Sequence, residues 1–192
     1  MREVKPGSSV YILDDVISDE LCNTLKIVID KSNCIKTDLR PGNNVICEFI
    51  DVSMLENKKF SNIIDKEIFT VICDIIKRVQ THNAYIGHIS KDEGYCLRKI
   101  TGPTRTHADS VFPTSGEQLL KSAAYDIRKL SLIIALNDDY EGGEFIFPNH
   151  DVEVKLKKRQ AIIFPPYWTH PHGTKELNNN TCRYTINTWL TE

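Results

Sequence analysis

Short β-strand patterns dominate the second half of the chain and limit the folds that it can adopt. Apolar segments at residues 130–136, 144–147, 152–156, 161–164 and 183–190 are separated by turn-forming residues. Such spacing of short strands is typical of a β-sandwich or jelly roll. We therefore predict a β core of this kind, with further strands just before it at residues 84–89 and 95–100.

The first half of the chain contains two amphipathic helical patterns. Ser18 is a suitable N-cap, and the acidic residues after it favour the positive end of a helix dipole. Apolar residues then recur at helical spacing until about Asp30, and a longer pattern of this kind spans residues 60–79. Between them, the composition turns polar over residues 31–44, where residues 39–44 predict a turn or mobile loop, and residues 45–52 predict a strand.

The length of the chain favours a single domain. Its 192 residues are enough to bury one sizeable core, and they contain no interdomain linker or internal repeat. We expect one domain over residues 1–192, an α+β protein that is mainly β. In this interpretation, helices at about residues 14–80 support a β core at about residues 84–192.

Charge and hydropathy exclude two classes of partner. No apolar run approaches the roughly 20 residues that span a bilayer, and the amino terminus lacks the apolar core of a signal peptide. The formal net charge of -2 gives no broad attraction to phosphate backbones, and the basic cluster at residues 155–159 is expected to be a solvated turn. We therefore expect a cytoplasmic protein that binds neither membrane nor nucleic acid.

The segment around His107 has the donors of a metal site. In a β-strand, alternate side chains share a face, so His107-Ala108-Asp109 places an imidazole beside a carboxylate. A surface His beside an Asp is commonly only solvated, but His170 or His172 could complete a set of three. Two imidazoles and one carboxylate on one side of a metal are typical of non-haem Fe(II) oxygenases. Spacing alone does not choose between the two distant histidines.

The last predicted strand adds a site for an anion. Arg183 and Thr185 lie one pleat apart, so they share a face. A guanidinium pairs with a carboxylate through a bidentate fork, and a neighbouring hydroxyl can add a hydrogen bond. The pair therefore suits the distal carboxylate of a dicarboxylate. The alternative is a charge on a surface strand, but the position of Arg183 in phase with Trp189 favours an inward face.

At these residues the chain resembles the Fe(II)- and 2-oxoglutarate-dependent dioxygenases, particularly the prolyl 4-hydroxylase-like branch. The similarity covers most of the chain and includes three signatures between the metal-binding segments. These are Leu136-Asn137, Gly142-Gly143-Glu144 and Phe147-Pro148. The resemblance implies a double-stranded β-helix, or jelly roll, with supporting N-terminal helices.

The resemblance also implies roles for individual residues. It favours His107, Asp109 and His172 as the catalytic iron ligands, because relatives place the distal ligand after Phe-Pro and often directly after a proline. His170 would then lie close to the substrate or serve a structural role. By the same likeness, Arg183 holds the far carboxylate of 2-oxoglutarate and Thr185 adds a hydroxyl.

The reaction implied by the resemblance needs Fe(II), 2-oxoglutarate and O2, with ascorbate as reductant. It hydroxylates an unactivated C–H bond, and a prolyl residue in a peptide or protein is the first-choice substrate. Another residue, a free amino acid or a small metabolite is the alternative within enzymes. A non-catalytic β-sandwich that binds a structural metal is the alternative outside them, and a closed site with four ligands would favour it.

The sequence departs from the branch at positions near the proposed site. Ala135 stands where many relatives have a tyrosine that binds 2-oxoglutarate, and Lys99-Ile100 stands where another tyrosine is common. Ser131 could supply a substitute hydroxyl. Residues 110–126 directly follow the first two proposed ligands, so we hypothesise that they form a lid facing the substrate.

Overall fold

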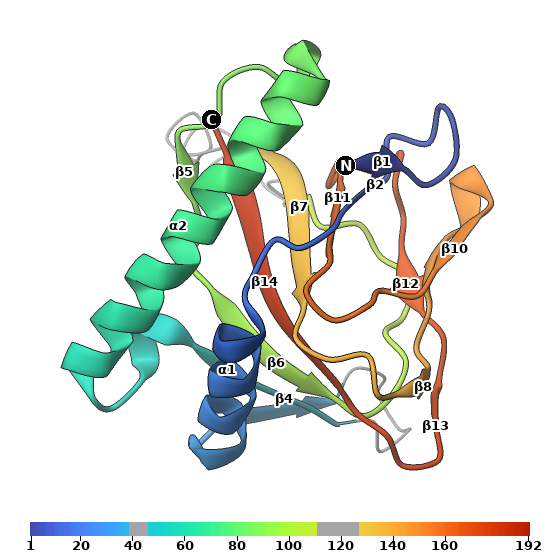
Figure 1. Cartoon of the computed structure of the whole chain (residues 1–192). Coiled ribbons are helices and arrows are strands. Elements are labelled where there is room, and N and C mark those ends of the chain that lie inside the picture. The colour runs from blue at the N-terminus through green and yellow to red at the C-terminus, as the bar shows by residue number, and fades with distance from the viewer. Residues whose placement is uncertain (39–45, 111–126) are drawn as a thin grey trace, which may run out of the picture.

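The computed structural model describes residues 1–38, 46–110 and 127–192. The hypothesised lid, apart from Ser110, and the predicted loop at residues 39–44 lie outside the described residues. The described part of the chain forms a nine-stranded antiparallel main sheet, in the order β1-β2-β11-β7-β14-β6-β4-β3 with β5 beside β14 (Figure 1). The strands are β1 (Arg2–Glu3), β2 (Tyr11–Leu13), β3 (Ile35–Asp38), β4 (Ile46–Asp51), β5 (Lys91–Asp92), β6 (Cys96–Ile100), β7 (Arg128–Ala135), β11 (Ala161–Phe164) and β14 (Arg183–Thr191).

A smaller set of strands forms the second layer of the β core. One sheet has the order β10-β9-β12, and a two-stranded ribbon pairs β13 with β8. Their bounds are β8 (Glu141–Gly142), β9 (Phe145–Phe147), β10 (Val152–Val154), β12 (Gly173–Thr174) and β13 (Leu177–Asn178). Apolar side chains of β9 and β10 pack against those of β2, β7 and β11, and this contact makes one of two hydrophobic cores.

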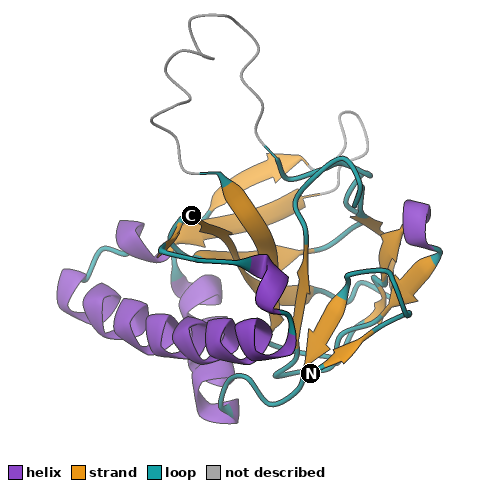
Figure 2. Ribbon diagram, turned by 90° about the horizontal axis from the view of Figure 1, so that it is seen from above, coloured by secondary structure: helices purple, strands orange, loops and turns teal. Residues whose placement is uncertain are grey.

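Two α-helices cover the opposite face of the main sheet (Figures 1 and 2). Helix α1 (Asp19–Lys31) begins at Ser18, whose Oγ accepts a hydrogen bond from the backbone N of Leu21 at 3.1 Å, as the sequence predicted. Helix α2 (Lys58–His82) buries one stripe of isoleucine and valine side chains against the sheet. The larger hydrophobic core lies between these helices and the sheet.

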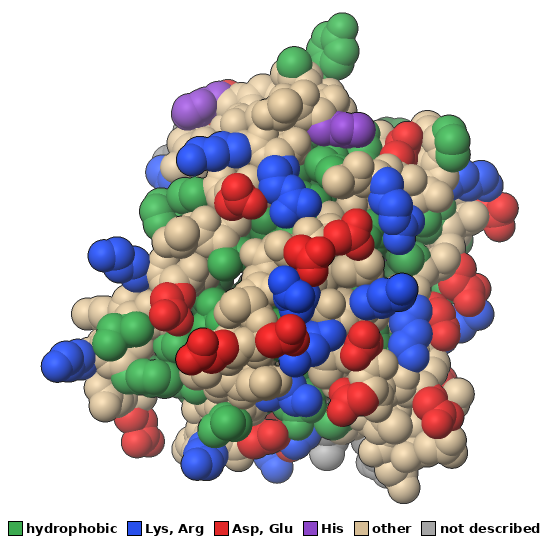
Figure 3. All heavy atoms as spheres, in the orientation of Figure 1, with side chains coloured by type: hydrophobic (Ala, Val, Ile, Leu, Met, Phe, Trp, Pro, Cys, Tyr) green, Lys and Arg blue, Asp and Glu red, His purple; other side chains and the backbone are tan. Residues whose placement is uncertain are grey.

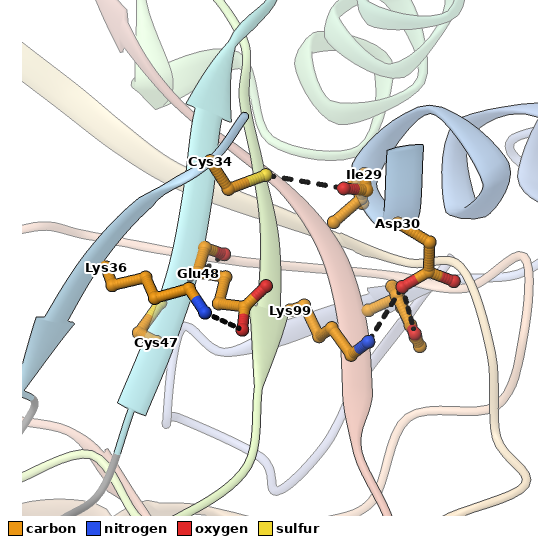
Figure 4. A network of polar contacts seen from close by, with 8 residues as sticks. Ile29, Asp30, Cys34, Lys36, Cys47, Glu48 and Lys99 are labelled. Carbon is orange, nitrogen blue, oxygen red and sulfur yellow. Dashed lines mark hydrogen bonds and ion pairs between the residues drawn. The ribbon is translucent and has the colours of Figure 1, made fainter. Parts of the chain in front are cut away.

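The helix-facing side of β6 and β14 is fixed by a small polar network (Figure 4). Asp30 at the end of α1 pairs with Lys99 Nζ at 2.7 Å and accepts a hydrogen bond from the Tyr184 hydroxyl at 2.8 Å. Lys99 and Tyr184 are direct partners in the β6–β14 register, and so are Arg98 and Thr185. Because neighbouring residues of a strand point to opposite faces, Arg98 and Thr185 point away from the helices, into the β core.

One predicted element was wrong. Residues 84–89 do not form a strand: the Asn83 side chain accepts a hydrogen bond from the backbone N of Tyr85, and the short 3₁₀-helix η2 (Ala84–Ile86) follows. The polar stretch after α1 begins with a strand that was not predicted, since β3 pairs with β4 there. Its polar residues suit an edge strand, where Lys36 forms an ion pair with Glu48 at 3.4 Å.

Acidic and basic side chains alternate over the face of the molecule that carries the helices. Figure 3 shows no large area of one sign there. In the predicted basic turn, Lys158 pairs with Asp19 at 2.7 Å and Arg159 pairs with Asp15 at 3.2 Å, so these charges are locally matched. No helix in the described part of the chain is both long and apolar enough to cross a membrane.

Candidate active site

A backbone bridge joins the two histidines that the sequence places on separate segments. His107 N donates to His172 O at 2.9 Å, and His172 N donates to His107 O at 2.8 Å. The pair therefore forms an isolated antiparallel bridge between the segment that follows β6 and the start of β12. This bridge places the two imidazole rings 4.6 Å apart, measured between their centroids.

Asp109 completes a compact group of three donors. Its Oδ1 lies 3.3 Å from His107 Nε2, and its Oδ2 lies 3.6 Å from His172 Nε2. One donor atom from each residue lies within 4.8 Å of the others, a spacing that could hold a metal ion. The structure thus brings together the three residues that the sequence analysis selected.

The hydrogen bonds of the rings leave the right nitrogens free for a metal. His107 Nδ1 lies 2.9 Å from the carbonyl oxygen of Arg105, and His172 Nδ1 lies 3.1 Å from that of His170. A carbonyl oxygen only accepts, so each Nδ1 carries the proton and each neutral Nε2 keeps its lone pair. Such outer hydrogen bonds orient metal-binding imidazoles. The group therefore fits a divalent metal.

His170, the competing distal histidine, lies outside this group. Its Nε2 is 2.9 Å from Ser8 O and its Nδ1 is 2.8 Å from Thr169 Oγ1, so both ring nitrogens are engaged elsewhere. The ring is buried, with 6% of its surface exposed, and it stacks on His150. The geometry therefore gives His170 a structural role at the base of β2.

Burial and charge prepare the three donors for a cation. Burial alone raises the pKa of the Asp109 carboxyl, but its contacts with His107 and His172, together with Ser131 and Trp189, outweigh burial and lower this pKa. The contact with Asp109 raises the pKa of His107, whereas burial lowers the pKa of His172. Asp109 is therefore anionic near neutral pH, and His172 stays neutral.

Ser131 supports the carboxylate instead of facing a cofactor. Its Oγ donates to Asp109 Oδ2 at 2.6 Å. We expect Ser131→Ala to weaken Mn(II) binding, measured by anaerobic titration, by about 10- to 100-fold, as loss of an outer partner of a metal ligand commonly does. Thr188→Val is a matched control, because this buried hydroxyl has no hydrogen-bond partner. Equal affinities in the two variants would remove the proposed role of Ser131.

Arg183 is a buried cation, as the shared face with Thr185 predicted. It is 2% exposed, its Nη1 donates to Gly143 O at 2.6 Å, and its guanidinium lies 4.6 Å from the centre of the Phe145 ring. Its Nε has no hydrogen-bond partner, and no carboxylate of the described residues forms an ion pair with it. Burial lowers its pKa to about 10. A buried charge without a partner is costly, so this position calls for an anionic ligand.

An open pocket connects the three donors with Arg183. Thr185 lies between them, where its hydroxyl donates to Asn187 Oδ1 at 2.6 Å. Trp189 also lines the pocket, whereas Trp168 is 73% exposed and does not. Several further lining residues were not identified from the sequence, and among them strand alternation could have indicated Arg98, Asn187 and Phe145.

The glycine pair of β8 shapes the wall that holds Arg183. Gly142 and Gly143 both have φ of +70°, and the Gly143 carbonyl binds the guanidinium. A Cβ on Gly142 would lie 2.2 Å from the backbone oxygen of Glu176, so this close approach requires glycine.

We expect Gly142→Ala to reduce the free energy of unfolding by about 2–4 kcal/mol, because backbone strain and a backbone clash act together. Urea denaturation measures the loss. Gly94→Ala is the matched control, since Gly94 has φ of +81° and nothing within 4 Å of a Cβ. A loss no larger than that of the control would show that the close approach at Glu176 is unimportant.

Comparison with known proteins gives a family match. Residues 96–191, half of the chain, match the model described as the 2OG-Fe(II) oxygenase superfamily. Prolyl 3-hydroxylase 2 of Homo sapiens and of Rattus norvegicus are each 34% identical to the chain over 92 residues. These matches cover 44% of the chain but 13% of each relative, so the chain spans a small part of their length.

Solved structures share the fold over nearly the whole chain. A viral collagen prolyl hydroxylase from Paramecium Bursaria Chlorella virus-1, as its 2OG complex, has a TM-score of 0.68 and 16% identity, with 98% of both chains covered. A prolyl hydroxylase from Trichoplax adhaerens, in complex with a hypoxia inducible factor oxygen degradation domain peptide fragment, has a TM-score of 0.68 and 14% identity, with 96% of this chain and 84% of that one covered. The predicted jelly-roll fold with supporting helices is confirmed.

Proposed function

Because the chain belongs to the 2OG-Fe(II) oxygenase superfamily, we propose that it hydroxylates a prolyl residue in a peptide or protein. The family makes the protein a 2-oxoglutarate-dependent dioxygenase that uses Fe(II) and O2. One observation carries the proposal: an unpaired, buried arginine shares a pocket with a group of two imidazoles and one carboxylate.

We propose that His107, Asp109 and His172 hold the iron. When bound, Fe(II) with 2-oxoglutarate and O2 supplies the oxidising power, and succinate and CO2 are the products from the cofactor. The protein positions the reactants and keeps the site dry. Asp109 contributes the negative charge, while the two carbonyl-bound imidazoles supply fixed neutral donors.

Arg183 and Thr185 are the proposed binding residues for 2-oxoglutarate. The Gly143 carbonyl accepts a hydrogen bond from Nη1, and Nε has no partner in the ligand-free protein, so it can donate to the distal carboxylate. The Thr185 hydroxyl donates its proton to Asn187. We therefore propose that Thr185 contributes to 2-oxoglutarate binding by packing beside the cofactor more than by donating a hydrogen bond to it. The tyrosine of many relatives is absent at Ala135, which leaves Arg183 as the main anchor.

The relatives favour prolyl hydroxylation over the alternatives. The curated matches and both solved structures are named prolyl hydroxylases, and one solved structure holds a peptide. Hydroxylation of another residue, or of a free amino acid, uses the same donors and remains the second candidate. The non-catalytic metal module is disfavoured, because the described residues offer three clustered donors and a structural zinc site commonly has four.

A coupled assay tests the proposal. Purified protein with Fe(II), 2-oxoglutarate and ascorbate is expected to form succinate, and a proline-containing peptide should gain one oxygen atom by mass spectrometry. The same peptide with alanine in place of proline is the control. Succinate without oxygenated peptide would leave an oxygenase with a different substrate, and absence of succinate under all conditions would contradict the enzyme proposal itself.

A further inference from the structure

A second arginine in the pocket has no anionic partner in the described structure. Arg98 lies on β6 opposite Thr185, and its side chain faces the pocket. Its hydrogen bond runs from Nε to Cys96 Sγ at 3.4 Å, and its guanidinium lies 5.9 Å from the centre of the Trp189 ring. No carboxylate of residues 1–38, 46–110 or 127–192 forms an ion pair with it.

Arg128, on the other strand beside Trp189, has the carboxylate partner that Arg98 lacks. Its guanidinium lies 4.0 Å from the centre of the Trp189 ring, and it binds both carboxylate oxygens of Glu93. It also donates to the backbone oxygen of Asp109. Trp189 therefore contacts two guanidinium groups. Arg128 is neutralised by the protein, whereas Arg98 is not.

The other charges of the pocket do not neutralise the positive charge of Arg98. Among the described lining residues, Asp109 is the sole carboxylate, and the cations are Arg98 and Arg183. If the proposed function holds, Fe(II) adds two positive charges and 2-oxoglutarate adds two negative ones. Asp109 and Arg183 then cancel, and the charge of Arg98 remains without a counterion in a partly buried site. A buried charge of this kind is favourable only when a ligand pairs with it.

The position of Arg98 separates it from the proposed cofactor anchor. Arg183 lies at the Phe145 end of the pocket, whereas the Arg98 guanidinium lies toward Trp189. Trp189 is the register partner of Ser131, which holds the Asp109 carboxylate. The tip of Arg98 is therefore at the donor end of the pocket, where the bond to be hydroxylated must approach.

We propose that Arg98 recognises a carboxylate on the substrate, close to the carbon that is hydroxylated. The inference rests on the proposed function and narrows its substrate class. A planar guanidinium binds a carboxylate in a two-pronged geometry, which fixes orientation as well as affinity. An acidic side chain beside the reacting residue, or the α-carboxylate of a free amino acid, supplies this chemistry.

Binding is measured without turnover, so that the test does not depend on activity. The chain has two tryptophans, and Trp168→Phe leaves Trp189 as the reporter beside Arg98. Protein loaded with Mn(II) and 2-oxoglutarate without O2 is titrated with short peptides that carry Glu directly before or after proline, each against its Gln counterpart. L-Proline against L-prolinamide forms the second arm and distinguishes the two sources of carboxylate.

In one arm or the other, the carboxylate ligand is expected to bind about 10-fold or more tightly than its neutral counterpart, as a charge-assisted pair commonly does. Arg98→Gln should remove this preference, and Arg98→Lys should restore part of it. The affinity for 2-oxoglutarate should stay unchanged in both. Arg2→Gln, which removes an exposed charge, is the control for long-range electrostatics.

Several results would overturn the inference. It fails if wild-type protein shows no preference for a carboxylate in either arm, or if Arg98→Gln keeps the preference. A weaker affinity for 2-oxoglutarate in Arg98→Gln, with the preference intact, would assign Arg98 to the cofactor instead. Failure of Mn(II)-loaded wild-type protein to bind 2-oxoglutarate would contradict the proposed function, so the two failures are distinguishable.

Discussion

Asp109→Ala is expected to abolish the formation of succinate from 2-oxoglutarate. The variant loses the only negative donor of the group and leaves the two imidazoles as neutral donors. Since removal of an outer partner already costs about 10- to 100-fold in metal affinity, loss of the ligand itself should reduce turnover on the order of 1000-fold or more. Succinate formation and anaerobic Mn(II) binding should fall together.

The control for this experiment is Asp151→Ala. Asp151 is an exposed aspartate whose carboxylate pairs with Lys5 on the surface, so its loss should leave metal binding and turnover unchanged. Thermal unfolding of the metal-free proteins checks that Asp109→Ala still folds. If Asp109→Ala and His107→Ala each retained full turnover, the iron would have to bind elsewhere.

Arg183→Met is expected to weaken 2-oxoglutarate binding strongly while leaving the fold intact. Truncating one partner of a buried, hydrogen-bonded charge pair commonly costs 2–5 kcal/mol, or roughly 30-fold or more in affinity. In the ligand-free protein, however, the guanidinium has no anionic partner among the described residues. A methionine of similar length should therefore cost the ligand-free protein little stability, and could even raise it.

Thermal shift measurements separate these two effects. Ligands that bind only the folded state raise the melting temperature, so wild-type protein should be stabilised by 2-oxoglutarate with Mn(II), and Arg183→Met should lose that stabilisation. The melting temperatures without ligand should be similar. An unchanged response to 2-oxoglutarate would exclude Arg183 as the cofactor anchor, and Arg2→Met controls for loss of an exposed arginine outside the pocket.

The sequence predicted the elements whose signals are local. The cap at Ser18 and the alternating pattern of β14 follow from a few neighbouring residues, and both are present in the structure. His107, Asp109 and His172 were also selected from the sequence, because donor type and spacing narrowed the choice. The selection of His172 over His170 came from resemblance, since both histidines lie on one short segment.

Features that depend on contacts between distant segments were not predictable. From the sequence, Ser131 was a candidate hydroxyl for the cofactor, but its hydroxyl donates to Asp109, which lies on a segment distant in the sequence. Arg98 was not identified from the sequence, because its role depends on whether a carboxylate lies nearby in space. Sequence periodicity gives no information about such neighbours. Residues 84–89 have strand-like composition, but the hydrogen bond that the Asn83 side chain accepts from the backbone N of Tyr85 favours a turn over a strand.

The backbone bridge between His107 and His172 bears on how the enzyme acquires its metal. Two backbone hydrogen bonds already hold these proposed ligands in register, and their rings are oriented by carbonyl oxygens. Because these residues are already ordered, binding of the ion costs little further conformational entropy. We therefore expect chelation and reloading to be reversible steps between two folded forms, unlike a zinc finger, whose chain collapses only around its metal.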